Sequence, residues 1–157
     1  MNFTPQFTTP DDVDRKTAAT NRYEPVTKYM AKNLITFSPD QTIQEVIDIM
    51  LENKISGGPV LNEKKELIGM ISERDCLKLV VDNAYNSRLP IERKVSMYMT
   101  HHVDTVSINA NIAYVADKFL KNTYRRFPVV DDHGRLMGQV SRRDILRAVK
   151  EMKVTTW

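Results

Sequence analysis

The chain has 157 residues, of which 41% are hydrophobic and 27% charged, values that suit one buried core and exclude a disordered chain or a fibre. Its net charge of +3 is mildly basic, which suits an anionic ligand without requiring nucleic acid. A single cysteine, Cys76, excludes an internal disulfide and a CxxC pair, and no apolar run approaches the roughly 20 residues of a membrane-spanning helix.

The chain starts with residues 1–22, which hold two prolines and several threonines but few large apolar residues, so we expect a flexible extension there. These residues also lack the apolar core of a secretory signal, and we therefore expect a cytoplasmic protein. A short β-type run follows at Leu34 to Phe37, and then Asp40 or Thr42 can serve as a helix N-cap.

An apolar stripe predicts a helix after this cap. The stripe follows helical spacing, and we expect all of it to face the core: Ile43, Val46, Ile47, Met50 and Leu51. Two apolar runs, PVL and LIGMI, are joined by the polar turn NEKKE and predict a β-hairpin. A second helix is expected to start at Ser72, and residues 81–94 then form a polar linker that contains Pro90.

This whole series of elements occurs twice. Residues 26–80 align with residues 95–149 without a gap, and roughly 19 of about 55 positions are identical. The second copy repeats the apolar stripe at Ile112, Val115, Ala116, Phe119 and Leu120, and Gly134 supplies a left-handed turn position in its hairpin. Two copies are too few for a solenoid. The sequence therefore predicts an α+β fold in which two βαββα repeats, over residues 24–80 and 95–150, pack as a pseudo-twofold pair.

A heptapeptide is the clearest part of the duplication. GMISERD at 69–75 and GQVSRRD at 138–144 share the pattern Gly, any, aliphatic, Ser, any, Arg, Asp. A strand that turns at Ser into a helix presents free N–H groups and a positive dipole end to an anion such as phosphate. The Asp in the first helical turn can accept hydrogen bonds from both hydroxyls of a ribose. The alternative is a capping box, in which the Asp only caps the helix, and both roles can coexist.

Four stretches carry a resemblance to a known family: VTKYMAKNLITFSPDQTI, ISGGPVLNEKKELIGMISERD, VSMYMTHHVDTVSINANI and YRRFPVVDDHGRLMGQVSRRD. In this order and spacing they resemble a tandem pair of cystathionine-β-synthase (CBS) domains, also called a Bateman module. The resemblance implies two clefts between the repeats, where adenosine-containing ligands such as AMP, ADP, ATP or S-adenosylmethionine bind. This sequence departs from the family pattern at two positions. Asn62 stands where Asp is common in the family, and Gly58 precedes Pro59 where the family has a larger side chain.

In the family, each cleft takes its motif from one repeat and its base-facing wall from the other. For the cleft of Asp144, the resemblance implies motif residues Gln139, Ser141 and Arg143, a base wall of Ile55 and Ser56, and phosphate contacts from Arg125 and Arg126. For the cleft of Asp75, it implies Met70, Ser72 and Arg74, with walls of Tyr124, Thr100 and His101. Because Ser56 and Gly57 replace the arginines there, we predict that the Asp144 cleft binds phosphorylated adenosine more tightly. The alternative for Arg125 and Arg126 is that they bind no phosphate and form a solvated strand edge.

Metal binding and catalysis are both disfavoured by the sequence. His101, His102 and Asp104 are close along the chain, but adjacent residues of a strand point in different directions, so we expect no metal site. His101 can contact a phosphate instead. There is no paired-carboxylate signature, nucleophile elbow or GxxxxGK[ST] loop, so we expect no enzyme.

The predicted function is a regulatory module that binds an adenosine-containing ligand and signals to an unknown effector protein in trans. A homodimer is expected, with the first helices of each repeat at the interface and Met50, Leu51 and Phe119 in the patch. Two alternatives remain: a ligand-free dimerising scaffold, and a nucleic-acid-binding module suggested by the basic balance and by Arg142 and Arg143. We consider nucleic acid the less favoured partner, and we expect no membrane.

Overall fold

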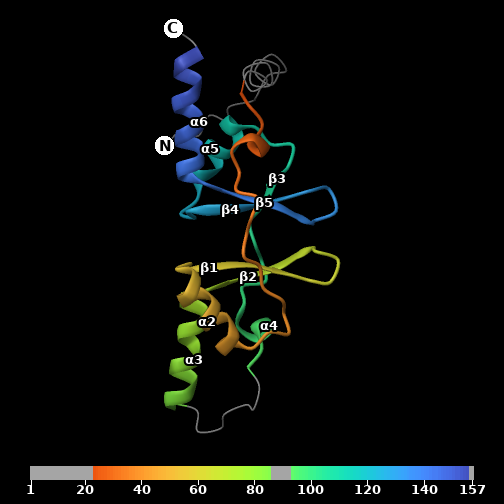
Figure 1. The fold of residues 1–157 in the computed structure, drawn as a ribbon, viewed down its shortest axis with the longest axis vertical. Helices are drawn as coiled ribbons and strands as arrows, with labels where there is room; N and C mark the ends of the chain where they lie inside the picture. The colour runs from red at the N-terminus through yellow and green to blue at the C-terminus, as the bar shows by residue number, and fades with distance from the viewer. Residues whose placement is uncertain (1–22, 86–92, 156–157) are drawn as a thin grey trace, which may run out of the picture.

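The computed structural model describes residues 23–85 and 93–155, which form two repeats stacked along the long axis of the molecule (Figure 1). The expected extension over residues 1–22 and the central part of the expected linker lie outside the described residues. The linker prediction began too early, because residues 81–85 continue the preceding helix. No proline or glycine interrupts the sequence in these five residues, so nothing there ends the helix.

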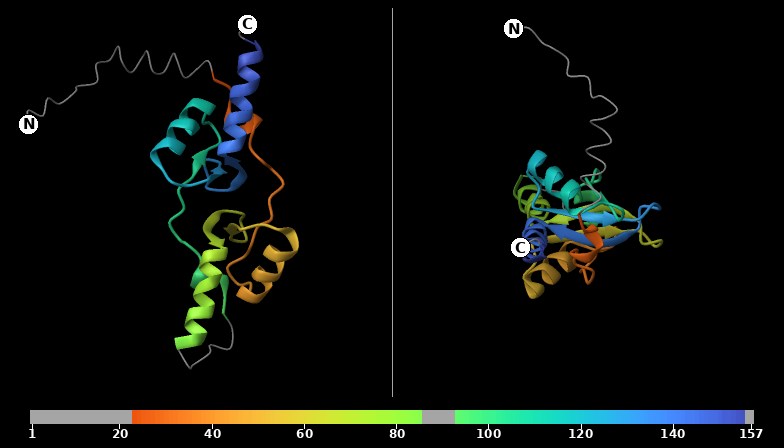
Figure 2. Two further views of the ribbon diagram at one scale, coloured as in Figure 1. Left: turned by 90° about the vertical axis from the view of Figure 1, so that its left-hand side faces the viewer. Right: turned by 90° about the horizontal axis from the view of Figure 1, so that it is seen from above.

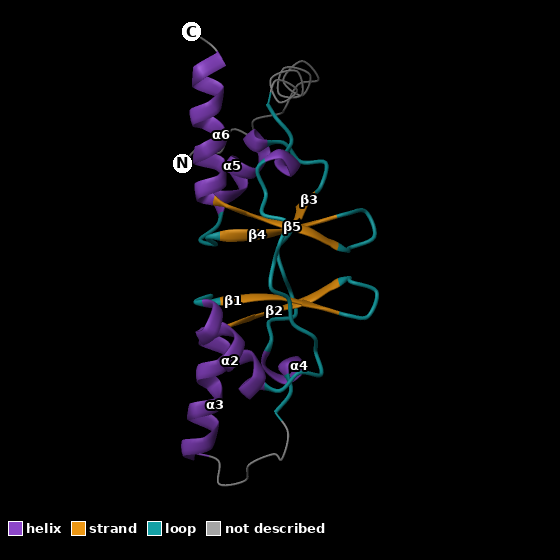
Figure 3. Ribbon diagram, viewed as in Figure 1, coloured by secondary structure: helices purple, strands orange, loops and turns teal. Residues whose placement is uncertain are grey.

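The elements follow the predicted order in both repeats. A turn of 3-10 helix, η1 (Val26–Lys28), precedes the first set, which is α2 (Ile43–Asn53), β1 (Gly57–Leu61), β2 (Leu67–Ser72) and α3 (Glu73–Tyr85). The second set is α4 (Val95–Tyr98), β3 (Val106–Ser107), α5 (Ile112–Lys121), β4 (Arg126–Val130), β5 (Leu136–Ser141) and α6 (Arg142–Thr155). The four longer helices lie on one side of the molecule and the hairpin turns on the other (Figure 3). The α+β prediction is confirmed.

The helix α2 begins where the sequence predicts. Thr42 is its N-cap, since the Thr42 hydroxyl accepts a hydrogen bond from Glu45 N and the Glu45 carboxylate accepts one from Thr42 N. Along the predicted stripe, Ile43, Val46 and Met50 are buried. Leu51, however, is 72% exposed. Eight residues of helix leave Leu51 rotated by about 80° from Ile43, which places it at the edge of the stripe.

The second repeat shows the same arrangement in α5. Asn111 caps the helix through a hydrogen bond from Tyr114 N, and Ile112, Val115 and Phe119 are buried. Leu120, the counterpart of Leu51, is 87% exposed. The inward orientation predicted for both leucines was therefore wrong.

Both predicted hairpins form, and they are antiparallel: β1 with β2, and β4 with β5. Gly134 has the expected positive φ of 76° in the second turn, and Lys65 takes a φ of 62° at the equivalent position in the first. The predicted strand at Leu34 to Phe37 is shorter than expected, because only Phe37 forms a bridge, parallel to Val60. Its counterpart β3 pairs with β4 over two residues.

The two repeats exchange the segments at their beginnings. Val26 and Tyr29, which start the first sequence copy, lie in the core of the second repeat with Val106 and Phe127. Val95, Tyr98 and Met99, which start the second copy, lie in the core of the first repeat with Val46 and Ile71. Backbone hydrogen bonds hold both exchanges: Val26 N donates to Ala110 O, and Val95 N donates to Gln41 O. A unit of the sequence duplication is therefore not a unit of the packed core.

The hairpins of the two repeats face one another near the middle of the molecule (Figure 1). Near the turns they are joined by two backbone hydrogen bonds, from Leu67 N to Gly134 O at 2.9 Å and from Leu136 N to Lys65 O at 3.1 Å. Each bond is the counterpart of the other under the sequence duplication. This reciprocity is what a pseudo-twofold axis between the repeats produces, as predicted.

None of the described helices is long and apolar enough to cross a lipid bilayer.

Candidate functional site

The heptapeptide of the first repeat forms the junction between β2 and α3. The carboxylate oxygen Asp75 Oδ2 accepts hydrogen bonds from Ser72 N at 3.0 Å and from the Ser72 hydroxyl at 2.8 Å. In return, Asp75 N donates to Ser72 Oγ at 3.4 Å. The predicted capping role of Ser-x-x-Asp is thus present, and Asp75 is buried, with 6% of its surface exposed.

The second heptapeptide has the same geometry at the junction between β5 and α6. Asp144 Oδ2 accepts hydrogen bonds at 2.7 Å from both the backbone N and the hydroxyl of Ser141, and Asp144 N donates to Ser141 Oγ at 3.3 Å. In both copies only Oδ2 takes part in capping. The other carboxylate oxygen, Oδ1, is thereby left for a different partner.

A cation three residues later contacts Oδ1 in each motif. Lys78 Nζ lies 3.1 Å from Asp75 Oδ1, and Arg147 Nη2 lies 2.9 Å from Asp144 Oδ1. Arg147 also donates a hydrogen bond to the backbone oxygen of Tyr29, whereas the exposed Lys78 has Asp75 as its acceptor. Because exposed ion pairs contribute about 0–1 kcal/mol, Lys78 can move aside at little cost. Arg147 is held by two acceptors, so moving it away from Asp144 breaks two hydrogen bonds, although the Asp144 side chain is slightly more exposed than that of Asp75, 15% against 9%.

A pocket of about 320 Å³ lies beside Asp75, between the two repeats. From the first repeat it is lined by Ser56, Gly57, Met70, Ile71, Ser72 and Asp75. From the segment that begins the second copy and from the second repeat it is lined by Thr100, His102, Val103, Asp104, Tyr124, Arg126, Pro128 and Gln139. The structure thus brings together the predicted residues Met70, Ser72, Thr100 and Tyr124 around Asp75.

Backbone pairing fixes the wall of this pocket. Met70 N donates to Thr100 O at 3.0 Å, and Thr100 N donates to Met70 O at 2.8 Å. These bonds attach the start of the second sequence copy to the edge of β2 in the first repeat. The same pairing joins Ala31 to Gln139 at the counterpart position.

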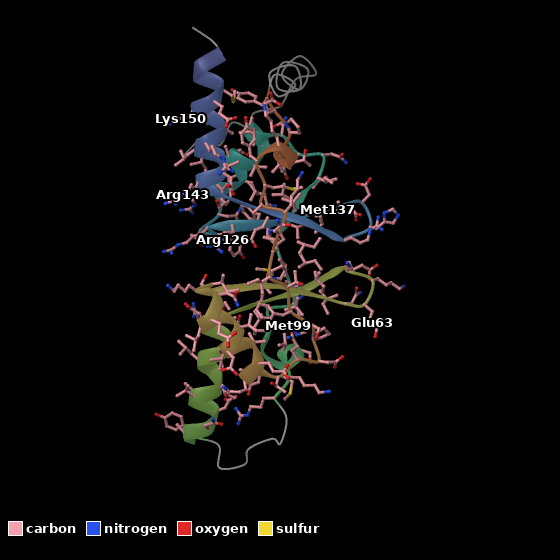
Figure 4. The ribbon with its side chains drawn as sticks, viewed as in Figure 1. Glu63, Met99, Arg126, Met137, Arg143 and Lys150 are labelled. Carbon is pink, nitrogen blue, oxygen red and sulfur yellow. The ribbon has the colours of Figure 1, made fainter. Side chains whose placement is uncertain are left out.

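The two adjacent arginines line different hollows. Arg126 lines the pocket of Asp75, and Arg125 lines the groove between α5 and α6. Arg126 is the first residue of β4, and Arg125 precedes the strand. Their assignment to a cleft of Asp144 stays a prediction. Figure 4 shows Arg126 at the level of β4, where the two repeats face each other.

The two adjacent histidines also differ in position. His102 lines the pocket and His101 does not, the reverse of the expectation. Val103 and Asp104 line the pocket too, so a two-residue alternation along this segment does not select His102.

The other residues expected in the Asp144 cleft are dispersed. Ser56 and Gln139 line the pocket of Asp75. Ile55 packs against the core of the first repeat, and Arg143 is exposed. Arg74, expected beside Asp75, is exposed and does not line its pocket. The prediction missed Asp104, which lines the pocket and is paired with Lys118 at 2.5 Å.

The charges around the pocket are largely compensated. Asp75 and Asp104 each have a lysine partner, and Arg126 adds a positive charge. Burial raises the pKa of the neighbouring Cys76 thiol above its ordinary value, and the carboxylates of Asp75 and Glu73 raise it further. Within residues 23–85 and 93–155, no group of three His, Cys, Asp or Glu side chains is placed to hold a metal ion. The arrangement is suited to binding a polar ligand with a ribose and an anionic group.

Comparison with known families agrees with this fold and site. The CBS domain model matches residues 26–82 and 95–151. The chain belongs to the CBS domain family and carries two copies of the domain, as the resemblance implied.

Particular relatives share most of the chain. Protein MJ1426 of Methanocaldococcus jannaschii is 32% identical, over 78% of this chain and 89% of that protein. The crystal structure of CBSX2 in complex with AMP, a protein of Arabidopsis thaliana, has a TM-score of 0.71 and 28% identity, and the match covers 82% of this chain and 98% of that one. The CBS domain pair of protein MJ0100, in complex with 5′-methylthioadenosine and S-adenosyl-L-methionine, has a TM-score of 0.66 and 27% identity, covering 83% and 98%.

Some relatives are much longer than this chain. It spans 42% of protein MJ1225 and 22% of an inosine-5′-monophosphate dehydrogenase, both from Methanocaldococcus jannaschii. The likeness to the dehydrogenase is through CBS domains, which are regulatory rather than catalytic.

Proposed function

We propose that this chain is a regulatory module that binds an adenosine-containing ligand between its two repeats and passes the ligand state to a partner protein in trans. The candidate ligands are AMP, ADP, ATP and S-adenosylmethionine. One observation carries the proposal: the pocket of Asp75 combines a carboxylate from the first repeat with an aromatic ring and a guanidinium from the second. These three groups can bind a ribose, a base and an anionic group such as a phosphate.

The ribose is assigned to Asp75. Its Oδ1 faces the exposed ammonium of Lys78, which a pair of ribose hydroxyls can displace at little cost. Oδ2 meanwhile keeps its hydrogen bonds to Ser72 and holds the carboxylate in place. A short side chain fixed in this way binds a diol without a further loss of conformational freedom.

The adenine is assigned to the ring of Tyr124. This ring packs edge-on against Phe127, with centroids 5.8 Å apart at 73°, and half of the residue remains exposed. A ring that is fixed by a core residue and open to the pocket can stack on a base.

The phosphate is assigned to Arg126, whose guanidinium can form charge-assisted hydrogen bonds. Because Arg126 lines the pocket of Asp75, we propose this pocket as the principal site. The Asp144 cleft becomes the weaker one, since Arg147 holds its carboxylate. This order reverses the sequence-based expectation.

Two structural relatives support the choice of ligand class. CBSX2 is described in complex with AMP, and the MJ0100 domain pair in complex with 5′-methylthioadenosine and S-adenosyl-L-methionine. All three ligands contain adenosine, so the shared requirement is a site for a base and a ribose.

Signalling requires a surface that another chain can contact. Met50 and Phe119, expected in a dimer patch, are only 4% and 7% exposed and offer little surface to a partner. Leu51 remains exposed, and so do Leu77 and Val80 on α3. We propose that such residues, with their counterparts in the second repeat, form a homodimer interface, and that an effector protein binds the assembled module.

Isothermal titration calorimetry with adenosine, AMP, ADP, ATP and S-adenosylmethionine tests the proposal. At least one of these compounds should bind with a stoichiometry near one per chain, and Asp75→Asn should weaken that binding at least tenfold. Asp144→Asn is the matched control, since it removes the same charge from the same helical turn. Melting temperatures of both variants without ligand separate lost capping from lost binding.

Two outcomes would overturn the proposal. If none of the five compounds binds, the module is a ligand-free scaffold. If Asp75→Asn and Asp144→Asn weaken binding equally at matched stability, the pocket of Asp75 is not the principal site. A salt-dependent gel shift with RNA or DNA would instead favour the nucleic-acid alternative.

A further inference from the structure

An exposed apolar patch is repeated on the two repeats of the molecule. Leu51, Leu77 and Val80 are 72%, 62% and 63% exposed in the first repeat. Their counterparts in the second repeat are also exposed, Leu120 at 87%, Leu146 at 70% and Val149 at 41%. These six residues are called the helix face below, because all of them lie on α2, α3, α5 and α6.

The helix face lies on one side of the molecule. Figure 2 (left) looks onto this side, and the pair α2 and α3 occupies one half of the view while α5 and α6 occupy the other. A half-turn in the plane of that view exchanges the two pairs. The internal pseudo-twofold axis therefore passes through the helix face.

Because of this axis, the apolar contacts alone do not determine in which of two orientations a second copy binds. A second copy can place its first repeat on the first repeat of this chain, or on the second. Since the three apolar residues of one repeat are identical to those of the other, both orientations bury the same side chains. Only residues that differ between the two repeats can favour one orientation of the dimer over the other.

The residues that differ at the edge of the helix face are charged. Glu73 precedes Leu77 by one helical turn on α3, and Arg142 precedes Leu146 at the same position on α6. In the described residues, neither Glu73 nor Arg142 has an ion-pair partner. Arg142 also lines the apolar groove between α5 and α6, which connects it to the helix face.

Neighbouring positions strengthen this asymmetry. Glu52 on α2 corresponds to Lys121 on α5, and Ser56 corresponds to Arg125. Lys54, which corresponds to Thr123, is the exception and adds one positive charge to the first repeat. The edge of the first repeat thus carries two acidic residues and one lysine, whereas the edge of the second carries three basic residues, of which Lys121 is paired with Asp117.

We propose that two copies of this chain associate head to tail through the helix face, so that the first repeat of each copy contacts the second repeat of the other. The inference rests on the homodimer proposed above and specifies its orientation. Head-to-tail association brings Glu73 near Arg142 of the second copy, and twofold symmetry repeats the pair. Head-to-head association would bring Glu73 near its own counterpart and Arg142 near its own, and like charges repel.

Charge reversal, with sedimentation velocity as the measurement, distinguishes the two orientations. Glu73→Arg and Arg142→Glu should each raise the dissociation constant of the dimer by about tenfold, equivalent to about 1.4 kcal/mol, because each change acts at two symmetric places. The double variant Glu73→Arg/Arg142→Glu should restore association to within about twofold of the unmodified chain. Glu63→Arg is the control, since it makes the same charge change on the hairpin turn away from the helices (Figure 4).

The charge at the start of a helix also affects stability, so melting temperatures accompany each measurement. The double variant, and an equimolar mixture of the two single variants, show whether each chain still folds and associates. Raising the salt concentration should weaken the dimer of the unmodified chain.

Each alternative outcome contradicts the proposal in a different way. A head-to-head dimer would tolerate both single reversals, and Glu73→Arg would associate preferentially with the unmodified chain. A monomer at micromolar concentration would remove the dimer itself, and with it the orientation, while ligand binding in the pocket of Asp75 would be unaffected.

Discussion

Replacing Arg126 with Gln should weaken the binding of AMP and leave the binding of adenosine nearly unchanged. The guanidinium lines the pocket of Asp75, where it is the group assigned to the phosphate. A hydrogen bond between charged groups contributes about 1.5–3 kcal/mol when it is shielded from water. Arg126 is exposed, so solvent screening lowers this to about 0.5–1 kcal/mol. The dissociation constant for AMP should therefore rise by about two- to fivefold.

Calorimetry with the two ligands separates the phosphate from the nucleoside. The ratio of the AMP and adenosine affinities should fall in Arg126→Gln, because the ratio cancels any general damage to the pocket. Arg125→Gln is the matched control, since Arg125 precedes Arg126 in sequence but lines the groove between α5 and α6. The assignment is wrong if adenosine binding weakens as much as AMP binding, or if Arg125→Gln has the same effect as Arg126→Gln.

Three further predictions concern stability. Phe127→Ala should lower the free energy of unfolding by about 3–5 kcal/mol in a denaturant titration, because Phe127 is fully buried and its ring centroid lies 4.7 Å from that of Phe119. A loss below about 1 kcal/mol would contradict this packing. Thr42→Ala should cost about 1 kcal/mol in the same titration, since it removes the hydroxyl that caps α2, and an unchanged midpoint would refute the cap. Burial and the hydrogen bond to Asp82 raise the pKa of Tyr98 above 10.0, so its contribution to stability is complete below that pH and is lost as the pH rises through the higher folded-state pKa. Tyr98→Phe should therefore flatten the alkaline part of a plot of melting temperature against pH, and an unchanged slope would rule this out.

Local signals in the sequence were sufficient for the helices and hairpins. Thr42 and Glu45 form the cap that the sequence allowed, and Gly134 occupies the left-handed turn position. The same periodicity failed at Leu51 and Leu120, because an apolar stripe does not show which of its edges the rest of the fold covers.

The site was predicted less completely than the fold. The pattern of Ser72 and Asp75 predicted both the cap and a polar position facing the cleft. Arg125 and Arg126 were predicted to act together, but Arg126 begins β4 and Arg125 precedes it, and the sequence does not show at which residue the strand starts. A gapless alignment of two copies shows which residues are equivalent, but it does not show which of them are in contact.

The exchange of segments between the repeats affects how the chain folds during synthesis. Val26 packs with Val106, about 80 residues later, and the core of the first repeat needs Val95, Tyr98 and Met99. The first repeat cannot complete its core while only residues 26–80 have left the ribosome, because its last core residues have not yet emerged. Long-range contacts of this kind slow folding, since a large loop must close before they form. The core of the first repeat has all its residues once Met99 has emerged, and the core of the second repeat only once Ala148 has emerged, so each repeat folds only after part of the other sequence copy is available.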